Sequence, residues 1–108
     1  MNQSVVISGA GVWNPPHTIT NEELVDSYNA YAEKFNSENA VAISNDEVTE
    51  MPMSSAPFIQ KASGIKQRYI YIKDGALDVN RMRPKIPKRA EDELSHQAEL
   101  ALNAAKIA

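Results

Sequence analysis

Only two stretches of this sequence have the residue content of β-strands, and this small number is the strongest limit on the fold. One is the β-branched run SVVISGAGVW, residues 4–13, and the other is IKQRYIYI, residues 65–72. Helical patterns account for much of the rest, and two strands are too few to cover several helices. The sequence therefore predicts an α/β fold in which residues 1–108 form an incomplete part of a domain, whose remaining strands come from polypeptide not present here.

The clearest helix is predicted to begin after Thr20. Thr20 and Glu23 have the spacing of a capping box, in which each side chain satisfies a free amide of the first turn. Apolar residues then recur at helical spacing and predict the buried stripe: Leu24, Tyr28, Ala32 and Phe35. The opposite, polar face is predicted to contain Glu22, Asn29 and Glu33.

Three further helices are predicted with different signals. Residues 37–53 have a weak apolar pattern that suits a second helix or a helical loop. Ser54 or Ser55 can cap a short helix that Gly64 ends, because glycine adopts the left-handed conformation without a Cβ clash. The last helix is predicted from about Ala90 onward, and residues 73–75 are predicted to form a turn.

The glycines of the first predicted strand do not form a dinucleotide-binding loop. Gly9 and Gly11 follow a strand pattern, but Asn14 stands at the third glycine position and two prolines follow where a helix should receive a pyrophosphate. The sequence instead predicts that these glycines let another backbone pack closely.

Composition excludes several kinds of site. A net charge of -3 argues against general nucleic-acid binding, and the absence of cysteine removes disulfides, thiolate ligands and a cysteine nucleophile from these residues. His17 and His96 are far apart and predicted to lie on the surface, so no metal site is expected.

Acidic residues at 22–23 and 91–93 are expected to favour helix starts through the helix dipole. With no signal peptide or membrane span in the pattern, the cytoplasm is the expected compartment.

Residues 81–89 form a basic loop with five basic residues. Such a loop is commonly a solvated connection. The alternative is a dock, in which Lys85, Lys88 and Arg89 attract an acidic carrier protein or a phosphate group.

Three motifs in order resemble the β-ketoacyl-acyl carrier protein synthase III family. ISGAGVWNPPHTITNEELV resembles the opening strand and helix of that family, and FIQKASGIKQR is similar to its Trp-Ile-x-x-Arg-Thr-Gly-Ile-x-x-Arg signature. DELSHQAELALNAAKIA is similar to its following alanine-rich helix. The longer segment at residues 36–53 resembles a branch that accepts medium-chain acyl-CoA and makes β-ketodecanoyl-carrier protein.

This resemblance implies a thiolase-like layered αβαβα fold, of which the chain is the amino-terminal portion. It implies a decarboxylative Claisen condensation of acyl-CoA with malonyl-acyl carrier protein in fatty-acid biosynthesis, carried out by a homodimer. The family uses a cysteine, a histidine and an asparagine, and none of these catalytic residues can be assigned here, so the chain alone is expected to be inactive. No permanently bound cofactor is implied, because coenzyme A enters as part of the substrate.

The resemblance also implies a coenzyme A contact. Phe58 stands at the family's tryptophan position and offers a ring for stacking on adenine. Ala62 stands at the position of the arginine on the other side of that base, so Lys61 is the neighbouring cation that remains. Ser63 keeps the hydroxyl of the family's threonine, and Gly64 matches the family.

Other interpretations of the same residues remain open. Phe58 is a core residue and Gly64 a simple helix stop if no ligand binds nearby, and Arg68 has a structural role in either case. A noncatalytic module that binds a partner or carrier protein through residues 81–89 is the rival function. A third possibility is a related condensing enzyme such as hydroxymethylglutaryl-CoA synthase.

Overall fold

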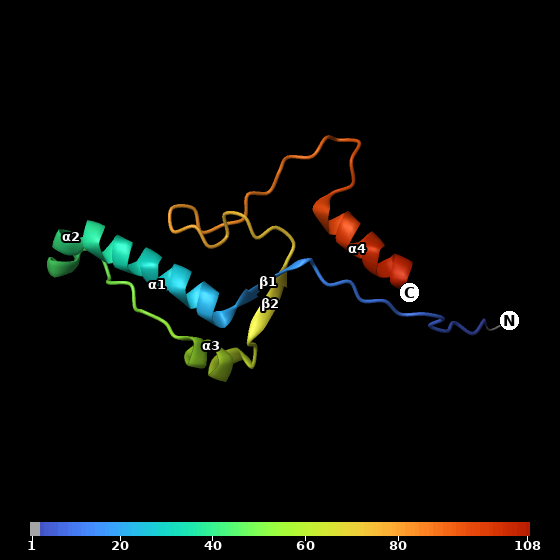
Figure 1. Ribbon diagram of the computed structural model, residues 1–108, viewed down its shortest axis with the longest axis horizontal. Coiled ribbons are helices and arrows are strands. Elements are labelled where there is room, and N and C mark those ends of the chain that lie inside the picture. The colour runs from blue at the N-terminus through green and yellow to red at the C-terminus, as the bar shows by residue number, and fades with distance from the viewer. Residues whose placement is uncertain (1–2) are drawn as a thin grey trace. The chain divides into compact units, whose positions relative to one another are not determined.

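The computed structural model describes residues 3–108, which form a mixed helix and strand structure (Figure 1). The chain divides into two compact units, one of residues 16–86 and one that combines the segment up to Pro15 with residues 87–108. The elements in chain order are β1 (His17–Thr20), α1 (Asn21–Glu38), α2 (Ala40–Ser44), α3 (Ala56–Ser63), β2 (Gln67–Ile70) and α4 (His96–Ile107). Among residues 3–108, no helix has the length and apolar character needed to cross a membrane.

The sheet consists of β1 and β2 paired antiparallel, with His17 opposite Ile70 and Thr20 opposite Gln67. The second predicted strand is thereby confirmed in a shorter form. His17 lies on the surface, as the sequence predicts, and it begins β1, which the sequence did not predict. The short HTIT segment forms a strand because β2 supplies hydrogen-bonding partners, which its own sequence pattern does not reveal.

Helix α1 begins where the sequence predicts. Thr20 Oγ1 accepts a hydrogen bond from the Glu23 amide at 3.1 Å. The Glu23 carboxylate lies 2.7 Å from Lys73 Nζ, and this ion pair joins the first turn of α1 to the segment after β2. The helix start is therefore fixed both by its own cap and by a tertiary contact.

The core of the residue 16–86 unit lies under α1. The buried apolar side chains among residues 3–108 are those of Ile19, Val25 and Ala32, and two polar residues, Asn21 and Ser27, are buried with them. Of the predicted stripe, Ala32 is buried, and the other three residues are half-buried. This core is small for a chain of this length.

Helix α3 also matches its prediction. The Ser55 hydroxyl accepts from the Phe58 amide at 3.3 Å, and Gly64 ends the helix with a φ of 74°. By contrast, the second predicted helix forms only over Ala40–Ser44. The chain from residue 49 to Ser55 then runs without regular structure back along α1 to α3 (Figure 1).

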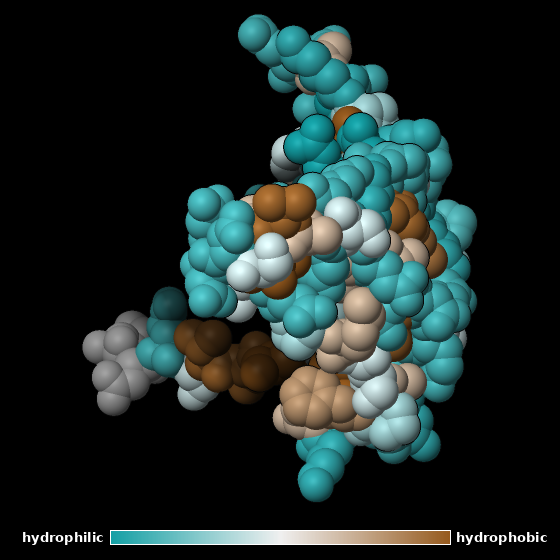
Figure 2. All heavy atoms as spheres, turned by 90° about the vertical axis from the view of Figure 1, so that its left-hand side faces the viewer, coloured by the Kyte–Doolittle hydropathy of each residue, from teal (hydrophilic) through white to brown (hydrophobic). Residues whose placement is uncertain are grey.

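Residues 4–13 do not form the predicted strand. Val5 is 94% exposed and Ile7 is 92% exposed. Figure 2 shows strongly hydrophobic side chains on the surface near the start of the chain. A strand is stable only when a neighbour satisfies its amides and carbonyls, and the described residues supply none here.

The glycines of this segment do allow the close approach that the sequence predicts. A Cβ on Gly11 would lie 2.6 Å from the Ala108 amide nitrogen and would also overlap the Ala104 carbonyl. The neighbouring backbone therefore belongs to α4, within the same compact unit.

Helix α4 begins later than predicted. Ser95 caps it by accepting from the Ala98 amide at 3.1 Å, so the first helical residue is His96 and not a residue near Ala90. The acidic residues at 91–93 precede the helix, and the Glu93 carboxylate accepts from the Ala90 amide at 3.0 Å. Their expected place in the first turn is wrong, because the stronger serine cap sets the boundary.

Candidate functional site

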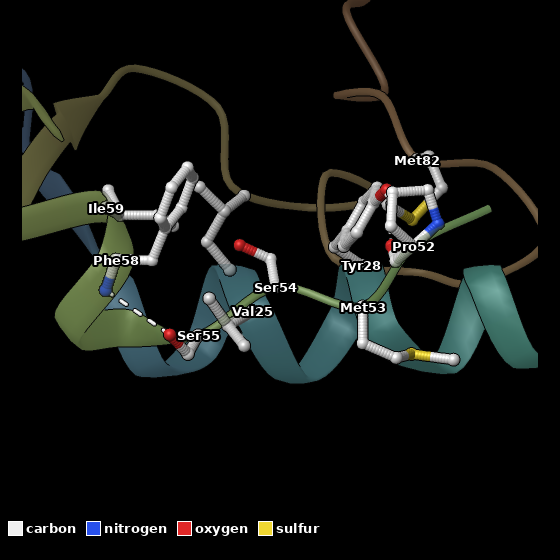
Figure 3. A pocket seen from close by; sticks show the side chains of 10 residues that line it. Val25, Tyr28, Pro52, Met53, Ser54, Ser55, Phe58, Ile59 and Met82 are labelled. Carbon is white, nitrogen blue, oxygen red and sulfur yellow. Dashed lines mark hydrogen bonds between the residues drawn. The ribbon is translucent and has the colours of Figure 1, made fainter.

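An apolar groove lies between α1 and α3 and has a volume of about 760 Å³ (Figure 3). We call it the α1–α3 groove. Helix α1, the segment before α3, α3 itself and one residue after β2 line it: Leu24, Val25, Tyr28, Pro52, Met53, Ser54, Ser55, Phe58, Ile59 and Met82. All of these residues belong to the residue 16–86 unit. The volume is within the range of pockets that hold small molecules.

Two asparagines of α1 hold one wall of this groove. The Asn29 amide nitrogen donates to the Ser54 carbonyl at 3.0 Å, and its oxygen accepts from the Ser54 amide at 2.9 Å. Asn36 makes the same pair of bonds to the backbone of Met51, at 3.0 and 2.9 Å. The Tyr28 hydroxyl donates to the Pro52 carbonyl at 3.0 Å. Residues 51–54 are thereby held along α1 without belonging to a sheet.

The sequence did not reveal this wall. The sequence places Asn29 on the polar face of α1. In the structure Asn29 is half-buried, because its side chain forms hydrogen bonds with the Ser54 backbone and not with water. The available signal was the spacing of seven residues between Asn29 and Asn36, which places two amides two turns apart on one helix face.

Among the predicted coenzyme A contacts, Phe58 is the one that lines the groove. Its side chain is 65% exposed, and Figure 3 shows it beside Ile59 at the α3 end of the groove. An aromatic ring that is both in a groove and open to solvent is able to stack on a planar ligand.

The other three predicted contacts, Lys61, Ser63 and Gly64, lie outside the groove lining. Lys61 is exposed near the end of α3. The Ser63 hydroxyl donates to the Ile59 carbonyl at 2.7 Å and accepts from the Ile65 amide at 3.2 Å. These bonds give Ser63 a role in ending the helix. A Cβ on Gly64 would meet no atom within 4 Å, so its conformation and not crowding requires glycine here.

Arg68 has the structural role expected from the sequence. Its Nη2 donates to the Asn21 side-chain oxygen at 3.2 Å. The Asn21 amide nitrogen donates to the Ile65 carbonyl at 2.6 Å, and the Asn21 backbone amide donates to the Lys66 carbonyl at 3.0 Å. Asn21, which the sequence did not single out, therefore joins the start of α1 to the turn between α3 and β2.

The three predicted docking residues fall in different units. Lys85 Nζ lies 3.7 Å from the Asp74 carboxylate within residues 16–86. Lys88 is exposed in the other unit. In that second unit Arg89 makes an ion pair of 2.5 Å with Glu99 and donates to the Leu94 carbonyl at 2.8 Å. Arg89 is thus held by α4.

Histidines and carboxylates do not gather into a metal site among residues 3–108. His17 is exposed in β1. His96 is half-buried, with Nε2 3.4 Å from the Pro87 carbonyl. The sequence predicted the surface position of His96 but not this contact, which forms because the chain before α4 folds back against the ring.

Comparison with known proteins gives one relevant similarity. No family model matches the chain. Over 84 residues, or 78% of its length, the chain is 42% identical to a protein of Pseudomonas aeruginosa described as beta-ketodecanoyl-[acyl-carrier-protein] synthase. The aligned part is 24% of that relative, so the chain spans about a quarter of the relative's length. Identity at this level supports a relationship to synthases of this type.

Proposed function

We propose that this chain is the amino-terminal portion of a condensing enzyme of fatty-acid biosynthesis that joins an acyl group from acyl-CoA to malonyl-acyl carrier protein with loss of carbon dioxide. The observation that carries the proposal is the 42% identity to a β-ketodecanoyl-carrier-protein synthase over most of the chain. In the complete enzyme the elements described above belong to a thiolase-like layered fold, and two copies form a dimer.

The proposal requires further polypeptide for catalysis. A condensing enzyme of this type transfers the acyl group to a cysteine, and residues 1–108 contain none. The exposed apolar residues Val5 and Ile7 support the same view, because additional strands would turn this segment into part of a sheet. Residues 1–108 alone are then inactive.

Within the complete enzyme, Phe58 contacts the adenine of coenzyme A. Its open ring face supports this role, and the groove beside it admits a ligand. Ala62 offers no second stacking plane, and Lys61 is the cation nearest in sequence on the exposed end of α3. Ser63 and Gly64 shape the helix end that presents the ring. Contact through one face predicts modest affinity for the nucleotide.

The test is condensation by the intact protein, measured as carbon dioxide released from malonyl-carrier protein with an acyl-CoA present. We expect Phe58→Ala to raise KM for acyl-CoA by about three- to tenfold and to change kcat little, since stacking stabilises ground state and transition state alike. Phe58→Trp retains a stacking ring and should keep KM within about twofold of the parent, at the scale of small changes in such contacts.

Pro57→Ala, next to Phe58 and outside the groove lining, is the matched control. An unchanged KM in Phe58→Ala would contradict the coenzyme A contact. Absence of condensation by the intact protein, with retained carrier-protein binding, would contradict the enzyme itself and favour the noncatalytic binding module.

Residues 81–89 provide a second test of the same enzyme. We propose that Lys85, Lys88 and Arg89 attract the acidic carrier protein. Replacing all three by glutamine should raise KM for malonyl-carrier protein most strongly at low salt, because exposed charges are screened within a Debye length of about 10 Å at 0.1 M salt. Lys88→Gln should account for most of the change, because Arg89 is already paired with Glu99. A salt response identical to that of the parent would leave this loop as a simple connection.

A further inference from the structure

A smaller hollow adjoins the α1–α3 groove. It has a volume of about 320 Å³, and its lining is Tyr28, Tyr31, Val79, Asn80, Arg81 and Met82. Tyr28 and Met82 line both hollows, so the two lie next to each other at this pair of side chains. Figure 3 shows Tyr28 and Met82 together at the end of the groove away from Phe58.

Most of the surface inside the groove is apolar and adaptable. Two methionines, Met53 and Met82, line it, and methionine side chains adjust to ligands of different shape. Met53 is 49% exposed, so apolar surface remains open to water and would gain free energy on being covered by a hydrocarbon.

Met82 is held in an uncommon backbone conformation at the junction. Its φ of 54° lies in the left-handed region, which residues with a Cβ seldom adopt. The Ser27 hydroxyl, on α1, lies 3.3 Å from the Met82 sulfur and donates to the Leu77 carbonyl at 2.8 Å. These contacts keep the methionine side chain at the place where the two hollows meet.

One cation lines the smaller hollow, and the Asp78 carboxylate lies next to this lining, where it accepts from the Asn80 amide at 2.9 Å. Arg81 is the only charged residue among the described residues that line either hollow. Its Nε donates to the Arg83 carbonyl at 3.1 Å and its Nη2 to the Pro84 carbonyl at 3.3 Å. These neutral acceptors orient the guanidinium but do not neutralise its charge. An anion is therefore the complementary group at this end.

We propose that the two hollows together bind a linear aliphatic carboxylate, with its hydrocarbon chain in the α1–α3 groove and its carboxylate at Arg81. The ligand is the free carboxylate and not its thioester, and it forms no covalent bond with the protein. The chain passes between Tyr28 and Met82 and ends toward Phe58. The proposal does not depend on the condensing function, although a ligand reaching Phe58 would compete with coenzyme A there.

Calorimetric titration of the intact protein with hexanoate, octanoate and decanoate tests this site. Each added methylene buries more apolar surface, so Kd should fall by up to about fourfold per methylene until the groove is full. Decanol, which has the chain without the charge, should bind more weakly than decanoate at low salt. The titration contains no thioester and no carrier protein, so its failure and the failure of the condensing function are separate results.

Three variants separate the charge from the chain. Arg81→Gln should weaken decanoate binding about fivefold at low salt and leave decanol unchanged, as expected for the loss of one exposed ionic contact. Arg83→Gln, the nearby basic residue that lines neither hollow, is the matched control and should bind decanoate as the parent does. Met53→Asp places a charge in the groove and should weaken both ligands.

The proposal is overturned if decanoate does not bind, or if affinity is independent of chain length. It is also overturned if Arg81→Gln and Arg83→Gln weaken binding equally, which would indicate a diffuse charge effect. If other polypeptide covers the groove in the intact protein, decanoate will not bind, and the proposal is overturned.

Discussion

Replacing Asn21 by leucine, which has a similar size but no hydrogen-bonding groups, is expected to lower the free energy of unfolding of the intact protein by about 2–3 kcal/mol. Asn21 is only 2% exposed, and both ends of its amide are used. Leucine leaves the Ile65 carbonyl and the Arg68 guanidinium without these partners. Arg68 Nη1 already lacks a hydrogen bond while buried, so the loss at Nη2 would leave the charged group poorly satisfied.

Denaturant unfolding measures this change, with Asp26→Asn on the exposed side of α1 as the control. The control should remain within about 0.5 kcal/mol of the parent, as most surface substitutions do. Asn21→Asp is informative as well, because it keeps an acceptor for Arg68 but replaces the donor to Ile65 by a carboxylate oxygen, which the Ile65 carbonyl oxygen repels. A loss below about 0.5 kcal/mol in Asn21→Leu would show that water replaces the amide at no cost, and that this junction does not stabilise the fold.

Replacing Gly75 by alanine should lower the free energy of unfolding by about 2–5 kcal/mol, from two causes that add. Its φ is 83°, a conformation that costs a residue with a Cβ about 1–2 kcal/mol. A Cβ at this position would also lie 2.8 Å from the Arg83 carbonyl oxygen and 2.9 Å from Arg81 Cδ. Because the backbone carbonyl cannot move aside as a side chain can, overpacking should add about 1–3 kcal/mol.

Gly64→Ala provides a matched control for the second cause. Gly64 has a similar φ of 74°, but its Cβ would meet no atom within 4 Å. It should therefore cost only the conformational part, about 1–2 kcal/mol. The difference between the two variants measures how tightly the turn at residues 73–75 packs against the start of the basic loop. Equal losses would mean that this packing contributes nothing.

The helix boundaries that the sequence predicted correctly depend on local chemistry. Thr20 and Ser55 each satisfy an amide three residues later, and Gly64 adopts a positive φ. These interactions are complete within a few residues of the chain, so no distant contact is needed to place them. The start of α4 follows the same rule, because the Ser95 hydroxyl accepts from the amide three residues later and the acidic residues before it provide no such cap.

The candidate site was only partly predictable for the opposite reason. Phe58 was found from its position in a family-like motif, and the structure places it in a groove. The other wall, which Asn29 and Asn36 hold, needed the path of residues 51–54 beside α1. The importance of Arg81 likewise depends on Met82 and Tyr28 meeting it in space.

The sequence by itself determined that helices begin at the Thr20 and Ser55 caps, that Gly64 ends one of them, and that residues 65–72 contain a strand. Tertiary structure alone decided that HTIT pairs with QRYI, that the described residues supply no strand partner to residues 4–13, and which side chains surround the groove. The physical reason is the range of the interactions. Helix caps and left-handed turns depend on interactions between residues close in the sequence. A paired strand or a pocket forms only when residues distant in the sequence come into contact.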